Sequence, residues 1–246
     1  WAMQAQNESV RQAALKLAGE TEAGDDALNR LKNMMRTQTS HSRTGYEMSR
    51  AWAQVVAREG RTQGLGDAIK RYLDARGVKN FAQASSWPIL LAYVETARLA
   101  GGADTLSSLE ELMNQPPGDI ASLNEQAYFT APDAWARTLT RNGKFEEYSR
   151  SSGLDADGAP KPSKLQEMLT SKERPMLAAA ALRAIAYARD PASARGPGAG
   201  RGVVEPKGPV PDIHPEPGSS SSSSSSWSSA RGSAPRFERE PPMNWM

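Results

Sequence analysis

The sequence predicts an all-α protein, a compact bundle of about eight to ten short helices followed by a disordered C-terminal tail. Apolar residues recur at spacings of three and four along residues 1–190, and they do not alternate with polar residues over the length of a strand. Val and Ile, which favour strands, number only eight and five in the whole chain. Pro, Gly and Ser dominate residues 191–246. We therefore expect a helical domain at 1–190 and a tail at 191–246.

Four successive apolar stretches predict the first four helices. They cover residues 10–18, 28–35, 46–56 and 65–73. Each stretch has apolar residues three and four positions apart, which places them on one helix face. Asp25 or Asp26 can cap the second helix, because a short carboxylate accepts from free backbone N–H groups. Gly19, Gly60 and Gly77 are expected to end the first, third and fourth helices.

The clearest helix is predicted over residues 86–100. Pro88 falls in its first turn, where the missing N–H does no harm. Residues 89–94 are apolar almost all round, which is typical of a central, buried helix. Glu95 and Arg98 lie three positions apart, so we expect them to form an ion pair towards the less buried end of the helix.

Five further helices are predicted in the second half of the body. They cover residues 106–113, 120–128, 132–142, 165–169 and 176–189. Thr130 is expected to cap the third of these, which Pro132 would open. Residues 145–148 can add a turn or two. Ser163 is expected to cap the fourth helix, and Pro175 to open the last one.

Two segments are predicted to lack regular structure. Residues 151–163 contain Asp-Ala-Asp-Gly and Pro-Lys-Pro, which indicate a loop or a linker between two lobes. In the tail, Pro, Gly and Ser fill 29 of 56 positions, and residues 219–226 are all Ser. Such a segment buries too little apolar surface to offset an ordering cost of about 1–2 kcal/mol per residue, so we expect it to be disordered.

Charge is unevenly distributed along the chain, although the net charge is only +2. Residues 25–80 hold eleven Lys or Arg against six Asp or Glu, a balance of +5. Residues 81–136 hold one against seven, a balance of −6. One interpretation is a set of solvated helix faces. The other is a basic surface for a polyanion beside an acidic surface for a neighbouring copy of the chain.

Polyanion binding is the leading functional hypothesis from the sequence. We call residues 25–80 the basic block. Its cations are the candidate phosphate-binding residues, namely Arg30, Lys32, Arg36, Arg43, Arg50, Arg58, Arg61, Lys70, Arg71, Arg76 and Lys79. Most are Arg, whose planar guanidinium binds phosphate through two parallel hydrogen bonds. The tail adds sparse Arg-Gly pairs, which are typical of loose single-strand binding. Without a recognition-helix motif, contact with the nucleic-acid backbone is expected rather than contact with bases.

The end of the predicted tail carries apolar side chains in an otherwise polar segment. These residues are Phe237, Met243, Trp245 and Met246. A disordered segment that ends in apolar anchors can dock in a groove on a partner or on the next subunit. The alternative is a solvated chain end. Docking leads to a second functional hypothesis, a helical adaptor whose tail is a peptide ligand.

Catalytic and metal-binding residues are sparse. The chain has two His and no Cys. His214 falls in the predicted tail, where it could not be held in the geometry that catalysis needs, and His41 lies in a polar loop. Glu110 and Glu111 are adjacent, so on a helix they diverge by about 100° and do not share a face. We expect no enzymatic activity, no metal site and no cofactor.

No run near 18 apolar residues and no charged-then-apolar leader is visible, so we expect neither a membrane span nor a signal peptide. The first residue is Trp1 rather than Met, which is typical of a fragment, a trimmed product or a partial reading frame. Ala, Ser and Pro together make up about a third of the chain, with an Ala-rich helix at 176–189 and the Ser tract at 219–226.

In this composition and layout the whole chain resembles the proline-alanine-serine-rich proteins of polymycoviruses, although helical capsid proteins or nucleoproteins of filamentous viruses share such a bias. The resemblance carries over no functional residue. It implies association with the double-stranded RNA genome of a fungal virus and a place in the cytoplasm of the infected host cell. Together with the charge pattern, it predicts a non-enzymatic, coat-like RNA-associated protein that also binds copies of itself.

Overall fold

The computed structural model describes residues 8–36, 43–75, 87–115, 125–151, 153–154, 156–194 and 207–213. These residues all belong to the first of two compact units, residues 1–215, and the second unit, residues 216–246, lies outside the described part. Every regular element that the structure describes is a helix, so the predicted all-α fold is confirmed. No helix among the described residues combines the length and the apolar character needed to cross a bilayer.

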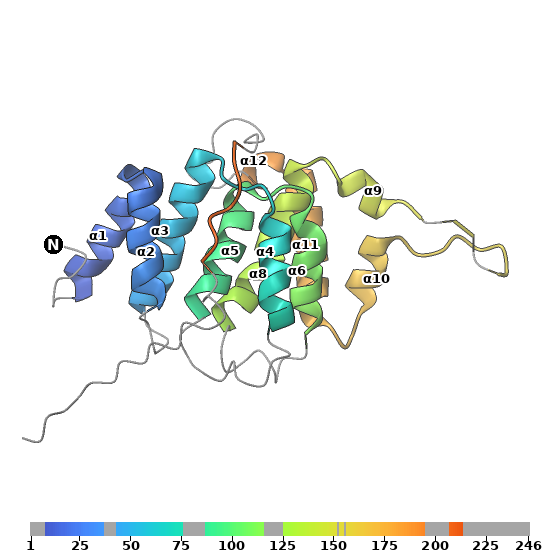
Figure 1. Ribbon diagram of the computed structural model, residues 1–246. Coiled ribbons are helices and arrows are strands. Elements are labelled where there is room, and N and C mark those ends of the chain that lie inside the picture. Colours follow the sequence, from blue (N-terminus) through green and yellow to red (C-terminus); the bar gives the residue numbers. More distant parts are fainter. Residues whose placement is uncertain are drawn as a thin grey trace, which may run out of the picture. The chain divides into compact units, whose positions relative to one another are not determined.

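The described helices pack mainly in a row. They are α1 (Glu8–Thr21), α2 (Gly24–Arg36), α3 (Arg43–Glu59), α4 (Leu65–Ala75), α5 (Trp87–Ala100), α6 (Thr105–Asn114), α8 (Glu125–Arg141), α9 (Phe145–Ser149), α10 (Lys164–Thr170), α11 (Pro175–Arg189) and α12 (Pro191–Ala194). Helices α1 and α2 pack on α3, which packs on α5; α5 packs on α8, and α8 on α11 (Figure 1). Helix α4 packs on α5 and α6.

Helix α5 is the central buried helix, as its apolar sequence predicts. Residues 89–94 are each at most 1% exposed. The rings of Trp52 and Tyr93 meet edge to face, with their centroids 5.8 Å apart. The predicted ion pair of Glu95 and Arg98 is present at 2.7 Å, but the Glu95 side chain is only 3% exposed. The pair is therefore buried more deeply than the sequence predicts.

Two buried hydroxyl groups join neighbouring helices. Ser49 on α3 donates to the carbonyl of Pro88 on α5 at 2.8 Å. Ser108 on α6 donates to the carbonyl of Gly66 on α4, also at 2.8 Å. Because an unpaired buried hydroxyl destabilises a fold, these bonds fix how the helices pair as well as satisfying the groups themselves.

Helix α8 overturns one prediction from the sequence. Thr130 does not cap a helix there; instead α8 continues through Pro132, and the Thr130 hydroxyl donates to the Gln126 carbonyl at 2.7 Å. Proline interrupts one backbone hydrogen bond of a helix. Ala131 and Trp135 on either side of it are fully buried, and α8 packs on α5, α6 and α11. Packing therefore outweighs the local cost of the proline.

The predicted start of α10 is confirmed in detail. The Ser163 hydroxyl accepts from the Gln166 backbone N–H at 3.2 Å, and the Gln166 side chain accepts from the Ser163 N–H at 2.8 Å. This reciprocal capping satisfies two N–H groups at the helix start. Pro175 begins α11, also as predicted.

The described residues between 151 and 163 form a closed loop. Bridges join Ser151 to Ser163 and Leu154 to Pro160. The Ser151 hydroxyl donates to the Lys161 carbonyl at 2.6 Å, and Lys161 N–H donates to a carbonyl near the start of the loop at 2.8 Å. The first compact unit is not divided at this loop.

Residues 207–213, which we call the C-terminal strap, lie along the loop that follows α3 (Figure 1, orange-red). The first strap residue donates its N–H to the Gly60 carbonyl at 2.7 Å. Gln63 bonds to the strap in both directions: its N–H donates to the Gly208 carbonyl at 3.1 Å, and its carbonyl accepts from Val210 at 2.9 Å. This is a short parallel pairing of two extended segments.

The end of the strap is bonded to α2 and α5. Lys32 Nζ donates to the Asp212 carbonyl at 2.6 Å, and the Ile213 N–H donates to the Tyr93 phenol at 3.2 Å. The Ile213 side chain is fully buried in the core. The folded body thus extends past the predicted boundary at residue 190, because the strap supplies a core side chain and its backbone groups find partners. Residues from 214 onward lie outside the described part.

Candidate nucleic-acid interface

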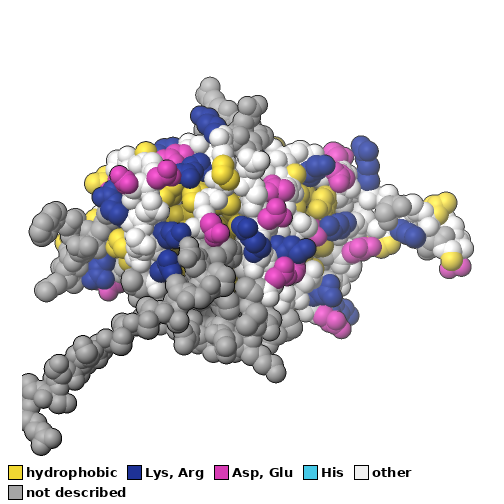
Figure 2. Space-filling model, viewed as in Figure 1, with side chains coloured by type: hydrophobic (Ala, Val, Ile, Leu, Met, Phe, Trp, Pro, Cys, Tyr) yellow, Lys and Arg dark blue, Asp and Glu magenta, His cyan; other side chains and the backbone are white. Residues whose placement is uncertain are grey.

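The predicted phosphate-binding residues that the structure describes are spread over several elements. Arg76 and Lys79 lie outside the described residues, and the other nine are spread over α2, α3, the loop after α3, and α4. On the face in Figure 2, Lys and Arg side chains are interspersed with Asp and Glu over the described residues. The segregation of charge along the sequence is therefore not a single-sign stripe on this face.

Arg58 serves the fold rather than a ligand. Its guanidinium donates to the carbonyls of Gly19 at 2.6 Å and Glu20 at 2.8 Å, and also to that of Glu22. These carbonyls lie at the C-terminal end of α1, where backbone acceptors lack helical partners and the helix dipole favours a cation. Arg58 thus caps α1 from α3.

Three more predicted phosphate ligands contact groups of the same chain. Arg30 pairs with Glu22 at 2.8 Å, and Arg61 pairs with Asp25. Lys32 donates to the Asp212 carbonyl in the strap. Each interaction ties two elements of the body together, so these side chains are partly committed before any ligand arrives.

Arg43 and Arg50, two further predicted cations, line a groove of about 550 Å³ between α1 and α3. Helix α1 contributes Ser9, Gln12, Ala13 and Lys16, and α3 also contributes Glu47, Ala51 and Gln54. We call this the α1–α3 groove. Its lining holds three cations against one carboxylate, together with neutral hydrogen-bonding side chains, so it favours an anion.

The two helices that form the groove run in the same direction. At their starts, the Thr44 hydroxyl donates to Glu8 at 3.0 Å, and at their ends Arg58 binds the Gly19 carbonyl. A side-chain carbon added at Gly19 would lie 2.9 Å from Cα of Ala51, so the close approach of α1 to α3 requires glycine there.

Arg50 is held in place within the groove by its neighbours. Its guanidinium carbon lies 5.5 Å from the centre of the Tyr46 ring, and one of its nitrogens lies 3.9 Å from Glu47. The ring and the carboxylate restrict the side chain, which is still 38% exposed. Burial, followed by the charge of Glu95, raises the pKa of Tyr46, so its phenol is neutral at physiological pH.

The groove cations are spaced along the helix axis. Arg43 and Arg50 are seven residues apart on α3, which corresponds to about 10 Å at 1.5 Å per residue. Lys16 lies near the level of Arg50, because Gly19, three residues further on, contacts Ala51. Two sets of donors about 10 Å apart suit a chain of phosphates better than a single phosphate ion.

The sequence did not single out Lys16 as a ligand, because it lies outside the basic block. The available signal was the spacing of Ser9, Gln12 and Lys16, which places three polar side chains on one face of α1. The other predicted cations lie elsewhere: Lys70 and Arg71 are exposed on α4, outside the groove lining.

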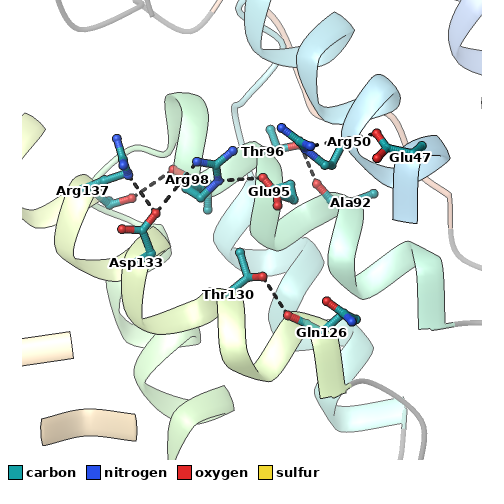
Figure 3. A network of polar contacts seen from close by, with 12 residues as sticks. Glu47, Arg50, Ala92, Glu95, Thr96, Arg98, Gln126, Thr130, Asp133 and Arg137 are labelled. Atoms are coloured by element: carbon teal, nitrogen blue, oxygen red, sulfur yellow. Dashed lines mark hydrogen bonds and ion pairs between the residues drawn. The ribbon is translucent and has the colours of Figure 1, made fainter. Parts of the chain in front are cut away.

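Part of the acidic block, residues 81–136, is paired in the interior of the fold. In Figure 3, Arg98 of α5 lies between Glu95 and Asp133, at 2.7 Å and 3.9 Å, and Asp133 also binds Arg137 at 2.8 Å. Tyr187 of α11 donates to the same Asp133 carboxylate. This network joins α5, α8 and α11. Its carboxylates are already paired, which argues against the predicted acidic surface as the contact for a neighbouring copy.

Glu110, another acidic-block residue, is also paired within the chain. Its carboxylate accepts from the Trp135 indole N–H at 3.1 Å and pairs with Lys164 at 2.7 Å. The Lys164 ammonium lies 4.4 Å from the centre of the Tyr148 ring. These contacts fasten α9 and α10 to α6 and α8.

Arg141 is a buried cation with a structural role. It donates to the carbonyls of Arg98 at 2.7 Å and Gly101 at 3.3 Å, which lie at the end of α5. Burial, and then the nearby charges of Arg137 and Arg98, lower the pKa of Arg141 to about 10. It therefore stays charged at physiological pH and caps α5 much as Arg58 caps α1.

The remaining predicted site residues cannot be placed. His41, His214 and the apolar anchors Phe237, Met243, Trp245 and Met246 lie outside the described residues. Within the described ranges, no group of three or more His, Asp or Glu side chains is arranged to hold a metal ion. The α1–α3 groove is therefore the candidate site for a ligand.

No protein-family model, curated protein or solved structure matches this chain significantly.

Proposed function

We propose that this chain is a non-enzymatic RNA-associated protein that binds the nucleic-acid backbone without sequence preference and associates with copies of itself, as coat-like proteins do. The observation that carries the proposal is the α1–α3 groove. Its lining contains three cations, Lys16, Arg43 and Arg50, and one carboxylate, Glu47. The groove replaces the broader basic block as the proposed phosphate-binding surface.

The groove chemistry favours phosphate over bases. Two guanidinium groups can each bind a phosphate through paired hydrogen bonds, and Gln12 and Gln54 can add neutral donors beside them. The described lining of the groove contains no aromatic side chain on which a base could stack. Binding through phosphates alone carries no sequence information, so the protein would coat an RNA rather than select a site on it.

Double-stranded RNA is the proposed polyanion. The compositional resemblance to the proline-alanine-serine-rich proteins of polymycoviruses motivates this choice, and with it a viral origin and a place in the cytoplasm of the infected host cell. In this proposal the chain has no catalytic residue and needs no cofactor. It coats the genome and does not process it.

A mobility-shift titration tests the proposal. Two unrelated RNA duplexes of equal length are titrated with the full chain at 50 and 200 mM salt. We expect equal affinities for the two sequences and a large loss of affinity at the higher salt, because binding releases cations condensed on the phosphates and this release is less favourable at higher salt. Absence of binding at low salt would remove the proposal. A tenfold preference for one duplex would contradict backbone recognition.

A further inference from the structure

The body carries a site for an extended peptide, which the C-terminal strap fills. The site offers both backbone groups of Gln63 for pairing, the Lys32 ammonium for a carbonyl, and the Tyr93 phenol for an N–H group. Its end is an apolar space that takes the whole side chain of Ile213. The site is thus built to recognise a short extended segment that ends in a branched apolar residue.

The strap reaches this site from a distant part of the chain. The strap is hydrogen-bonded to Lys32, Gly60, Gln63 and Tyr93. These residues lie 120 to 180 positions before their partners in the sequence. The preceding anchor is α12, where Arg137 donates to the Ala194 carbonyl at 2.8 Å. The contacts themselves do not require that strap and site belong to the same chain.

The sequence places twelve residues between the end of α12 and the start of the strap. Thirteen Cα-to-Cα steps can span at most about 45 Å. This reach is comparable with the width of a domain, so a strap that leaves its own site can enter the site of an adjacent copy. Reciprocal exchange of an identical element fills every site with the same contacts as before.

We propose that copies of this chain associate by exchanging straps, so that residues 207–213 of one copy fill the Gln63, Lys32 and Tyr93 site of another. The inference rests on the self-association in the proposed function and names its interface. Reciprocal exchange closes a dimer, and serial exchange links copies into a chain. The exchanged strap replaces the acidic block as the proposed interface between copies, because Glu95, Glu110 and Asp133 of that block are paired within the chain.

Disulfide trapping between two single-cysteine variants tests strap exchange. The natural chain has no Cys, so each introduced thiol is the only one present. Gln63 and Pro209 are bridge partners, and both side chains are exposed. A Gln63→Cys chain and a Pro209→Cys chain are unfolded together, refolded as a mixture, oxidised and separated on a non-reducing gel. A Gln63→Cys chain mixed with a Lys172→Cys chain is the matched control.

We expect several-fold more mixed disulfide dimer from the Gln63→Cys and Pro209→Cys mixture than from the control. A double variant that carries both cysteines reports on the strap within one chain. If it forms an intramolecular disulfide while the mixture gives no more dimer than the control, strap exchange is wrong. If the double variant forms no disulfide at all, the strap does not occupy this site, and the proposal is overturned as well.

RNA binding by the same samples separates the two proposals. A mixture that forms no trapped dimer but still shifts duplex RNA removes strap exchange and leaves RNA association intact. A mixture that forms the dimer but shows no RNA binding at low salt supports strap exchange and removes the proposed RNA association.

Discussion

The backbone N–H of Ile213 donates to the phenolic oxygen of Tyr93 at 3.2 Å and so bonds the central helix α5 to a residue 120 positions further along the chain. Both side chains are fully buried. A segment that its Pro and Gly content marks as unstructured is therefore part of the hydrophobic core. This one bond connects the most buried helix of the body to the proposed interface between copies.

Replacing Tyr93 by Phe is expected to lower the free energy of unfolding by about 1–3 kcal/mol, because it leaves the buried Ile213 N–H without an acceptor. Urea unfolding followed by circular dichroism measures the change. Tyr128→Phe is the control, since among the described residues no hydrogen bond ends on that hydroxyl, and its cost is expected to stay below about 0.5 kcal/mol. If the two variants lost the same free energy of unfolding, the Tyr93–Ile213 hydrogen bond would not stabilise the fold.

Stability is expected to fall as the pH rises above about 10, the usual pKa of a tyrosine. Burial raises the pKa of Tyr93, and likewise those of Tyr46, Tyr128, Tyr148 and Tyr187. Below pH 10 these phenols are neutral in both the folded and the unfolded chain, so their contribution is complete. Above pH 10 the unfolded chain loses protons first, which favours unfolding.

Arg141 acts in the opposite direction over the same range, because its pKa is lowered to about 10 and the folded chain releases that proton first. Comparison of wild type with Tyr93→Phe isolates the tyrosine. Between pH 10 and 11 the variant is expected to lose up to about 1.4 kcal/mol less stability per pH unit, measured by urea unfolding. Identical pH dependence of the two proteins would show that the Tyr93 phenol does not titrate differently on folding.

Arg58→Ala is expected to lower the free energy of unfolding by about 1.5–3 kcal/mol, since several carbonyls at the end of α1 lose a charged donor. Arg58→Lys should restore only part of this, because one ammonium cannot reproduce the fork of a guanidinium. Urea unfolding and amide exchange within α1 measure both variants. An Arg58→Ala protein as stable as wild type would contradict the capping role.

Local signals account for the helices that the sequence predicted well. Ser163 and Gln166 define the start of α10 through neighbouring residues alone, and the apolar run of α5 identifies a buried helix without knowledge of its partners. Helix α8 was wrongly divided because Pro132 is a local helix-breaking signal. Its tolerance depends on packing against α5 and α11, which are distant in the sequence.

The strap and the groove show the same limit. The strap composition predicts disorder, and only the apolar pair Val210 and Ile213 hinted at burial. For the groove, the sequence identified Arg43 and Arg50 as cations but gave Arg58 the same role. Composition reveals charge, whereas the fold determines whether that charge already has a partner.

Gly66→Ala is expected to destabilise the protein by about 1–3 kcal/mol, because a side-chain carbon there would lie 2.9 Å from the carbonyl carbon of Asp104 and closer still to its oxygen. Gly208→Ala in the strap is the matched control, since its nearest neighbour would be 4.0 Å away, on the Arg61 side chain. Its effect should stay within about 0.5 kcal/mol. Thermal unfolding of both variants decides, and a tolerated Gly66→Ala would contradict the close contact of α4 with the loop before α6.

The most direct test of the central claim is the salt dependence of RNA binding by a groove variant in which Lys16, Arg43 and Arg50 are all replaced by Ala. The control replaces three exposed cations outside the groove, Lys172, Arg174 and Arg189. Each phosphate contact contributes about 0.7–0.9 to the slope of log K against log salt. We expect the slope to be smaller in magnitude by about 2–3 for the groove variant than for the wild type, and unchanged for the control variant. Equal slopes for the two variants would contradict phosphate binding in the α1–α3 groove.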